Sequence, residues 1–351
     1  MTTKNTYNLN DITSDIIKSI EPTFDEKLFL SLFNNDISFK SIDKQEDILV
    51  SFIVPTHNRY DMLKQTLMSI VAQTEIPYEI IIINDNSSQE AYKQLENDYK
   101  DLPITYIVNN ESKGPGIARN KGFNVSKGKY IVFMDDDDFY LVNDFLLEAI
   151  NKLEENKDLS FVSFNTITYY EETNSINTNK INTKGFINGQ DYFLNFIRKY
   201  QKPTSTFPTV FRKEKLIQAN FSTMEMMNDA SIYLRALTQG DAFIFDRYIG
   251  AYRVHTSNIS KNIPFDFIIE NIKEKYNIYN LASDKFKTNL EDWLLNQVLD
   301  TFRYYVIDSN CNMTNAIKFI NLTNSITKLS KSKLYYNYFK FIILKQAIKL
   351  R

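Results

Sequence analysis

The stretch Tyr130-Ile-Val-Phe-Met-Asp-Asp-Asp-Asp138 decides the fold prediction, because a short apolar run leads directly into four carboxylates. An apolar run of this length predicts a buried β-strand. Adjacent carboxylates at a strand end repel one another and raise one another's pKa unless a cation neutralises them. Oxygen ligands suit Mg²⁺ or Mn²⁺. The run Asp135 to Asp138 therefore predicts a divalent-cation site, with a solvated acidic loop as the alternative.

Upstream of this run, short apolar segments alternate with segments of helical periodicity. The apolar segments predict strands at 49–54, 79–83, 104–108 and 130–134. One helix is predicted after the first strand, where Leu63, Leu67, Ile70 and Val71 share one face, and two more are predicted at 91–99 and 117–125. This alternation predicts an α/β fold with a mostly parallel sheet flanked by helices. Ligands of such sheets bind beyond the carboxyl ends of the strands. The loops after Val54, Ile83, Val108 and Met134 are therefore expected to face one crevice.

The second half of the chain has a mixed pattern. Strands are predicted at 161–170, 206–211 and 242–246, helices at 192–200 and 230–238, and a hairpin loop at 173–184. From Pro264 onward the pattern is helical. We therefore predict a helical lead-in over residues 1–46, in which Asp11 caps a helix, an α/β domain over 47–260, and a basic C-terminal helical region over 261–351.

Composition excludes several protein classes. With 43% hydrophobic and 24% charged residues, the 351-residue chain is neither disordered nor collagen-like. Its single cysteine, Cys311, excludes an intrachain disulfide and a cysteine-rich metal cluster, which favours a reducing compartment. The amino terminus lacks the apolar stretch of a signal peptide, and no apolar run is long enough to span a bilayer. We expect a cytoplasmic protein.

Charge is unevenly distributed along the chain. After Asp308 there is no acidic residue, whereas seven lysines and Arg351 give +8; the net charge of −2 therefore leaves −10 for the preceding part. This asymmetry predicts peripheral contact of residues 318–351 with an anionic inner membrane leaflet. The alternatives are solvated helix faces, packing against the rest of the chain, and a homo-oligomer. No nucleic-acid partner is expected.

The acidic run resembles the Asp-x-Asp motif of inverting family 2 glycosyltransferases with the GT-A fold. Other segments resemble the same family. They are Val54-Pro-Thr-His-Asn-Arg59, Ile82-Ile-Asn-Asp-Asn-Ser-Ser88, Gly114-Pro-Gly-Ile-Ala-Arg-Asn-Lys-Gly122, Asn228-Asp-Ala-Ser-Ile-Tyr-Leu-Arg235 and Tyr252-Arg-Val-His255. Asn84, Asn86 and Asn228 depart from the family pattern, in which an aspartate, a glycine and a glutamate are usual.

The resemblance implies a role for each matching residue. Asp137 would bind the metal, Asp135 would lie near the ribose, and Asp229 would be the general base. The remaining residues expected to bind the nucleotide sugar are Pro55, Thr56, His57, Asp85, Arg119, Asp136, Arg235 and His255. A carboxylate at position 85 can accept the imide N–H of uracil. The guanidinium of Arg119 can bind a diphosphate through two parallel hydrogen bonds or brace the base-binding loop. Alternative roles are a surface position for His57, a helix N-cap for Asp229 and a buried structural role for His255.

The function that the resemblance implies is a metal-dependent single displacement with inversion. A hexosyl or N-acetylhexosaminyl group would pass from a nucleotide-diphosphate sugar, a UDP-sugar first of all, to a hydroxyl of a glycan or lipid-linked acceptor in bacterial surface polysaccharide biosynthesis, with Mn²⁺ or Mg²⁺ as cofactor. The alternative is a non-catalytic module that binds saccharide or a divalent ion on a GT-A scaffold. A dinucleotide-binding enzyme is disfavoured, because Gly114-Pro-Gly116 lacks the third glycine of that fingerprint.

Overall fold

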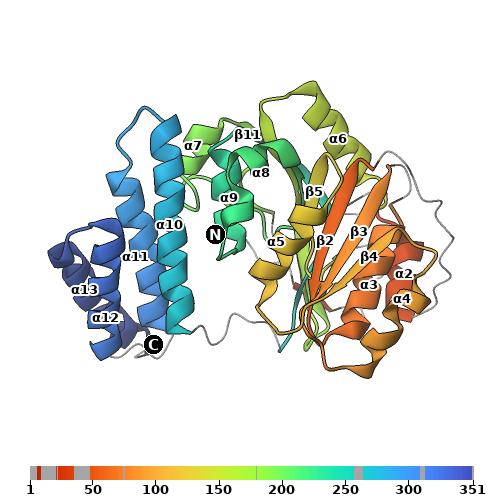
Figure 1. Ribbon diagram of the computed structural model, residues 1–351, viewed down its shortest axis with the longest axis horizontal. Coiled ribbons are helices and arrows are strands. Elements are labelled where there is room, and N and C mark those ends of the chain that lie inside the picture. Colours follow the sequence, from red (N-terminus) through yellow and green to blue (C-terminus); the bar gives the residue numbers. More distant parts are fainter. Residues whose placement is uncertain are drawn as a thin grey trace. The chain divides into compact units, whose positions relative to one another are not determined.

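The computed structural model describes residues 6–8, 21, 23–34, 48–73, 76–178, 180–256, 264–308 and 313–349. These residues belong to two compact units (Figure 1). Unit 1 comprises residues 1–223 and 232–256, and unit 2 comprises residues 224–231 and 257–351. The helix expected at Asp11 and the predicted domain boundaries at 46/47 and 260/261 lie outside the described residues.

The first half of unit 1 forms the parallel part of the sheet. In space the strands run β5 (Tyr130–Phe133), β2 (Val50–Thr56), β3 (Tyr78–Asn84) and β4 (Ile104–Val108), and each pairs in parallel with its neighbour. All residues of β2, β3 and β5 are buried, which explains why these strands read as continuous apolar runs. Because the four strands are parallel, their carboxyl ends lie at the same edge, as the sequence predicted.

Helices connect these strands. They are α3 (Tyr60–Val71) and α5 (Pro115–Val125), and Figure 1 shows both beside the parallel strands. The helix expected at 91–99 is instead the 3₁₀ turn η1 (Glu90–Gln94) followed by the short helix α4 (Leu95–Asp98). Its buried residues Tyr92 and Leu95 are three positions apart, a spacing that suits three residues per turn.

The remaining strands of unit 1 extend the sheet mostly in antiparallel fashion. Strand β10 (Thr209–Arg212) joins β5 to β7 (Leu159–Tyr170). Within the segment 173–184 that was expected to be a hairpin loop, residues 175–177 instead form the strand β8 (Ser175–Asn177), which pairs antiparallel with β7. The strand predicted at 242–246 is much longer: β11 (Asp241–Val254) pairs in parallel with β7 and antiparallel with two short strands. These two are β6 (Phe139–Tyr140) and β9 (Gly185–Ile187). Pairing of β11 with β6 places the end of β11 beside the acidic run, a consequence that periodicity does not reveal.

Two further helices of unit 1 differ from expectation. Helix α7 (Gly189–Leu194) ends well before the end of the helix expected at 192–200, because the chain leaves helical geometry at the C-cap Asn195, whose φ is −111° and ψ 19°. Helix α6 (Phe145–Glu155) was not predicted. The other elements are β1 (Thr6–Asn8), α2 (Glu26–Asn34), α8 (Lys213–Gln218), the 3₁₀ turn η2 (Phe221–Thr223) and α9 (Asp229–Leu237), which starts in unit 2 and continues in unit 1.

Unit 2 contains the helices predicted after Pro264. They are α10 (Phe265–Lys285), α11 (Glu291–Asp308), α12 (Met313–Thr327) and α13 (Lys331–Lys349). Aromatic side chains pack them together, since Phe302 stacks on Phe319 with 4.3 Å between ring centroids and also contacts Tyr338. Among the described residues, no helix is both long and apolar enough to cross a membrane. The predicted fold class, a mostly parallel sheet flanked by helices with a C-terminal helical region, is confirmed.

Candidate functional site

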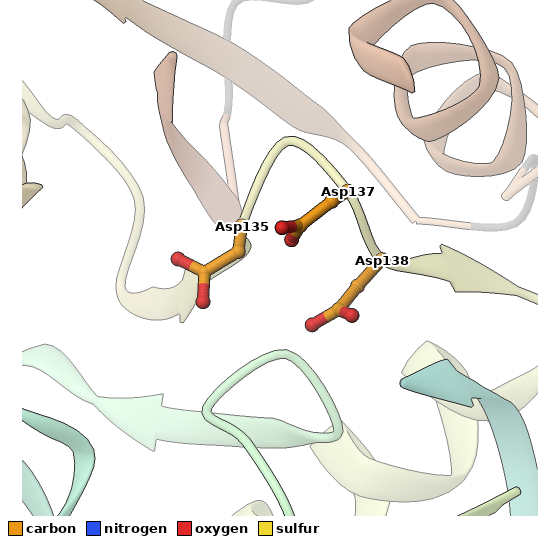
Figure 2. A group of neighbouring side chains, drawn as sticks. All are labelled: Asp135, Asp137 and Asp138. Carbon is orange, nitrogen blue, oxygen red and sulfur yellow. The ribbon is translucent and has the colours of Figure 1, made fainter. Parts of the chain in front are cut away.

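The acidic run lies at the carboxyl edge of the parallel strands, directly after β5. Asp135, Asp137 and Asp138 each place a carboxylate oxygen within 4.8 Å of the others, and Figure 2 shows their side chains gathered around one turn of the chain. Asp136 is not a member of this group, and its carboxylate lies 2.8 Å from Arg59. The structure thus separates four adjacent aspartates into a cluster of three and one outlier.

Burial shapes the electrostatics of the run. It raises the pKa of Asp138 well above the usual value, and the charges of Asp137 and Asp135 add to this effect. It also raises the pKa of Asp136 to about 7, against the opposing charge of Arg59. Burial acts in the same direction on Asp137, but contacts with His255 and Arg59 outweigh it and hold the pKa of Asp137 below its usual value. Concentrated carboxylates with such altered pKa values are typical of functional sites.

Arg59 is a site residue that the sequence analysis did not assign. Its guanidinium lies 2.5 Å from Asp137 and 2.8 Å from Asp136, so it bridges two carboxylates of the run. It follows β2 in the segment Val54-Pro-Thr-His-Asn-Arg59, and β2 is the parallel neighbour of β5. The position of Arg59 just beyond the strand next to β5 is the sequence signal that could have identified it.

The end of β11 supplies two further contacts to the run. His255 Nε2 lies 2.9 Å from Asp137 Oδ2, and the imidazole is buried. The backbone N–H of Arg253 donates a hydrogen bond of 3.0 Å to Asp138 Oδ1. The buried position expected as the alternative for His255 is therefore present, together with direct contact to the predicted metal ligand.

Asp85, after β3, is the centre of a second network. Its carboxylate accepts hydrogen bonds from Asn109, Ser112 and the backbone N–H groups of Lys113 and Gly114. Burial by itself would raise the pKa of Asp85, but these hydrogen bonds lower it. A carboxylate offers about four lone-pair sites. The four donors of loop 109–114 therefore occupy it, and that loop leads into α5.

Arg119 lies on α5, near the start of that helix. Its guanidinium forms an ion pair with Asp135, and its side chain is buried while that of Asp135 is 27% exposed. Helix α5 lies close to the sheet at Gly122, where a Cβ would come within 2.5 Å of Ile53 and 2.7 Å of Ile83. The close packing of α5 explains how Arg119 reaches the aspartates.

Comparison with known proteins identifies the family. The model described as Glycosyl transferase family 2 matches residues 51–237, which include β2, Asp85, Arg119 and the whole acidic run. The chain belongs to this family.

Individual relatives cover different parts of this glycosyltransferase. The UDP-Glc:alpha-D-GlcNAc-diphosphoundecaprenol beta-1,3-glucosyltransferase WfaP of Escherichia coli is 28% identical over 218 residues, 61% of this chain and 80% of WfaP. An uncharacterized glycosyltransferase of Rickettsia bellii is 35% identical over 133 residues, 37% of this chain and 19% of that protein. YibD of Escherichia coli is 24% identical over 60% of this chain and 63% of YibD. The chain thus spans less than two thirds of the last two relatives.

A solved structure shares the fold. The S. aureus TarS fragment 1–349 in complex with UDP-GlcNAc superposes with a TM-score of 0.61, covering 86% of this chain and 92% of that fragment. The sequence identity is 14%, so this likeness establishes the GT-A fold alone.

The β2 residues predicted to pack against a base lie beside Asp85 in this family member. Pro55 and Thr56 are buried at the end of β2, and the Thr56 hydroxyl lies 2.5 Å from the hydroxyl of Tyr92. His57 is exposed, as its alternative reading expected, and its Nδ1 lies 2.7 Å from the carbonyl oxygen of Asp85. The loops after β2 and β3 are thereby joined. Contact of these residues with a nucleotide stays a prediction.

Asp229 begins α9 within unit 2, and it is half-buried. Its neighbour Asn228 caps the helix, since the Asn228 side chain accepts from the backbone N–H of Ser231 at 2.8 Å while the Ser231 hydroxyl bonds the Asn228 carbonyl. The capping role considered for Asp229 therefore belongs to Asn228. The base assignment stays a prediction.

Arg235, at the other end of the same motif, is fully buried in unit 1. Its guanidinium donates to the carbonyl oxygens of Ala219 and Asn220, at 2.7 and 3.0 Å. These bonds brace the turn between α8 and η2. Its predicted contact with the nucleotide sugar stays a prediction.

A pocket of about 510 Å³ lies beside the Asp85 network. It is lined by loop 109–113, one face of α5 and Ser222, and no residue that the sequence predicted for the site contributes to it. Asn109 connects the two regions, because its amide bonds Asp85 on one side and its carbonyl oxygen accepts from Lys121 on the other.

Proposed function

We propose that the chain is an inverting, cation-dependent glycosyltransferase that moves a sugar from a UDP-sugar to a hydroxyl of a glycan or lipid-linked acceptor in bacterial surface polysaccharide biosynthesis. The observation that carries the proposal is the cluster of Asp135, Asp137 and Asp138 with Arg59 and His255 beside it, at the carboxyl edge of the parallel strands. The activity named for WfaP supports the donor class and the acceptor class, and the UDP-GlcNAc complex of TarS supports the donor class. The transferase domain we assign is residues 47–260, followed by the helical region 261–351.

The donor set fits a divalent cation. Asp135, Asp137 and Asp138 would hold it, and they offer carboxylate oxygens within 4.8 Å of one another. Carboxylate oxygens are ligands that Mg²⁺ and Mn²⁺ accept. Bound there, Mn²⁺ or Mg²⁺ would supply Lewis-acid stabilisation to the departing diphosphate.

The positive groups next to the cluster serve the same leaving group. The guanidiniums of Arg59 and Arg119 each contact a carboxylate of the run. A planar guanidinium binds phosphate oxygens through bidentate hydrogen bonds. His255 orients Asp137 from the side of β11. Together they offset the negative charge that a diphosphate brings to four carboxylates.

Asp229 is the general base of the proposed reaction. It would take the proton from the acceptor hydroxyl as that oxygen attacks the anomeric carbon and the bond to the nucleoside diphosphate breaks, which inverts the configuration. Because Asn228 caps α9, the Asp229 carboxylate is not needed for capping. A carboxylate in the first turn of a helix is also favoured by the helix dipole.

The nucleotide side of the site comprises Asp85 with Pro55, Thr56, His57, Asp135, Asp136, Arg235 and His255. The uracil imide N–H would replace one of the four donors that Asp85 accepts, so uridine binding is expected to move loop 109–114. Protection of the Lys113 and Gly114 amides from hydrogen exchange should change when UDP is added. Unchanged exchange with UDP bound would remove Asp85 from base recognition.

The rival proposal is a non-catalytic module that binds saccharide or a divalent ion on the same scaffold. Incubation of the full chain with individual UDP-sugars and Mn²⁺ separates the two, with UDP release as the readout. A transferase is expected to release UDP slowly to water and faster with acceptor. A chain that binds UDP-sugars and releases none from any of them would support the module.

A further inference from the structure

Helix α13 is apolar on two faces, and one of them packs against the described helices of unit 2. Leu334, Tyr338 and Phe341 are buried, and Tyr338 and Phe341 contact Phe302 of α11. The opposite face carries Tyr336, Phe339 and Ile343, which are 71%, 55% and 67% exposed. A helix that is apolar all round is normally covered on all sides.

The exposed apolar residues lie along one side of α13. Tyr336, Phe339 and Ile343 are spaced three and four positions apart, which places them along one side of a helix. Lys333 and Lys340 are exposed and lie beside these apolar residues, because positions 333, 336 and 340 also follow helical spacing. We call these five residues the α13 stripe.

The lysines of α13 divide between the two faces. Lys345 points inward, since its Nζ donates a hydrogen bond of 2.7 Å to the carbonyl oxygen of Val306 near the end of α11. A lysine on the last carbonyls of a helix is a favourable cap. The sequence places Lys340 and Lys345 on different faces, and the structure gives the two different roles: Lys345 fixes α13 to α11, whereas Lys340 faces outward.

We infer that the α13 stripe is a docking surface for an anionic lipid bilayer. Aromatic and aliphatic side chains bordered by lysines are the features of a helix that lies in the plane of a membrane interface. The whole segment from residue 309 to 351 carries +8 and no acidic residue, so attraction to anionic headgroups acts along its length.

A second copy of the chain fits this surface less well. A two-fold interface places the same patch on both partners. Lys333 and Lys340 would then meet lysines, and the segment 309–351 holds no acidic side chain to pair with them. Charge complementarity thus favours the bilayer.

Sedimentation with vesicles tests the inference directly. The full chain is expected to sediment with vesicles of equal parts phosphatidylglycerol and phosphatidylcholine, and to stay in the supernatant with phosphatidylcholine alone. The triple variant Tyr336→Ser, Phe339→Ser, Ile343→Ser should bind the anionic vesicles at least about tenfold more weakly, and Lys333→Gln with Lys340→Gln should weaken binding to a similar degree. The substituted side chains are exposed, so the helix bundle is expected to remain folded.

A matched control removes the same charge elsewhere. Lys100→Gln with Lys127→Gln changes two exposed lysines of unit 1 and is expected to leave vesicle binding unchanged. Equal binding by all variants, or no binding by the parent chain, would overturn the inference. A concentration-dependent dimer that the triple variant abolishes would assign the stripe to a second copy instead. Sedimentation requires no turnover, so its outcome is independent of the proposed transferase activity.

Discussion

His255 Nε2 lies 2.9 Å from Asp137 Oδ2, although 118 positions separate the two residues in the chain. Strand β11 brings them together by pairing with β6, the short strand that follows the acidic run. Groups that orient a metal-binding carboxylate typically contribute 10- to 100-fold to metal affinity or activity. The contact therefore has consequences that kinetics can measure.

His255→Ala is expected to lower kcat/KM for UDP-sugar turnover by roughly 10- to 100-fold, because Asp137 loses the contact that orients it and lowers its pKa. His255→Gln retains an N–H donor of similar reach and should recover part of the loss. Rates measured across a Mn²⁺ titration check this prediction. Equal rates for parent and alanine variant would reduce His255 to a packing residue.

Asp137→Asn and Asp136→Asn should behave differently although the residues are adjacent. Asp137 belongs to the carboxylate cluster, so its loss is expected to reduce cation-dependent UDP release by more than about 100-fold. Asp136 lies outside the cluster and contacts Arg59, so its amide variant should lose about tenfold or less. Binding of Mn²⁺ by calorimetry, with each variant at equal concentration, gives the second readout. Equal loss in both variants would contradict the division of the run.

Asp229→Asn is expected to block sugar transfer by about 10²- to 10⁴-fold while UDP-sugar binding persists, because only the proposed general base is removed. The matched variant Asn228→Ala removes the cap of α9 and should cost about 1 kcal/mol of stability with transfer largely retained. Transfer to acceptor and donor binding are measured separately. Near-normal transfer by the Asp229→Asn protein would exclude it as the base.

Lys275 is expected to destabilise unit 2 at neutral pH. Burial lowers its pKa from 10.5 to about 8, although Glu274 and Asp300 favour the charged form. Because the unfolded chain holds this proton more tightly, the penalty is full below about pH 8 and disappears as the pH rises through 10.5. Lys275→Met should therefore stabilise the protein by about 1–3 kcal/mol at pH 7 and have a smaller effect at pH 10.

Urea denaturation followed by the fluorescence of Trp293, the single tryptophan of the chain, reports on unit 2 because Trp293 lies in α11. Lys273→Met is the control, because Lys273 lies on α10 together with Lys275 but is exposed. This substitution should change stability by less than about 0.5 kcal/mol. A stabilisation by Lys275→Met that does not fade with rising pH would show that packing, not the charge, is responsible.

Gly122→Ala is expected to destabilise unit 1 by about 1–3 kcal/mol, because the added methyl group would lie 2.5 Å from Ile53 and 2.7 Å from Ile83. It should also displace Arg119 from Asp135, since both depend on the position of α5. Asn124→Ala, on the exposed side of the same helix, is the control and should be near neutral. Thermal unfolding of the two variants, measured side by side, tests this prediction, and equal stability of both would contradict it.

The sequence by itself determined the parallel half of the sheet and the acidic run. Buried parallel strands read as apolar runs, so β2, β3 and β5 could be placed within a few residues, and the apolar residues of the partly exposed β4 allowed it to be placed as well. Their shared direction then places Asp85 and the aspartates at one edge. The C-terminal helices followed from periodicity in the same way. These features depend on local patterns that a linear sequence carries.

Tertiary structure alone decided which side chains meet. Nothing in the spacing of the acidic run shows that Asp135, Asp137 and Asp138 converge while Asp136 lies outside their cluster, because that depends on the turn after β5. The partners of Asp137 come from β2 and β11, which are remote in sequence. On α13, the roles of Lys340 and Lys345 follow from which helix face packs on α11. Contacts between distant segments depend on strand order and helix packing, which periodicity does not encode.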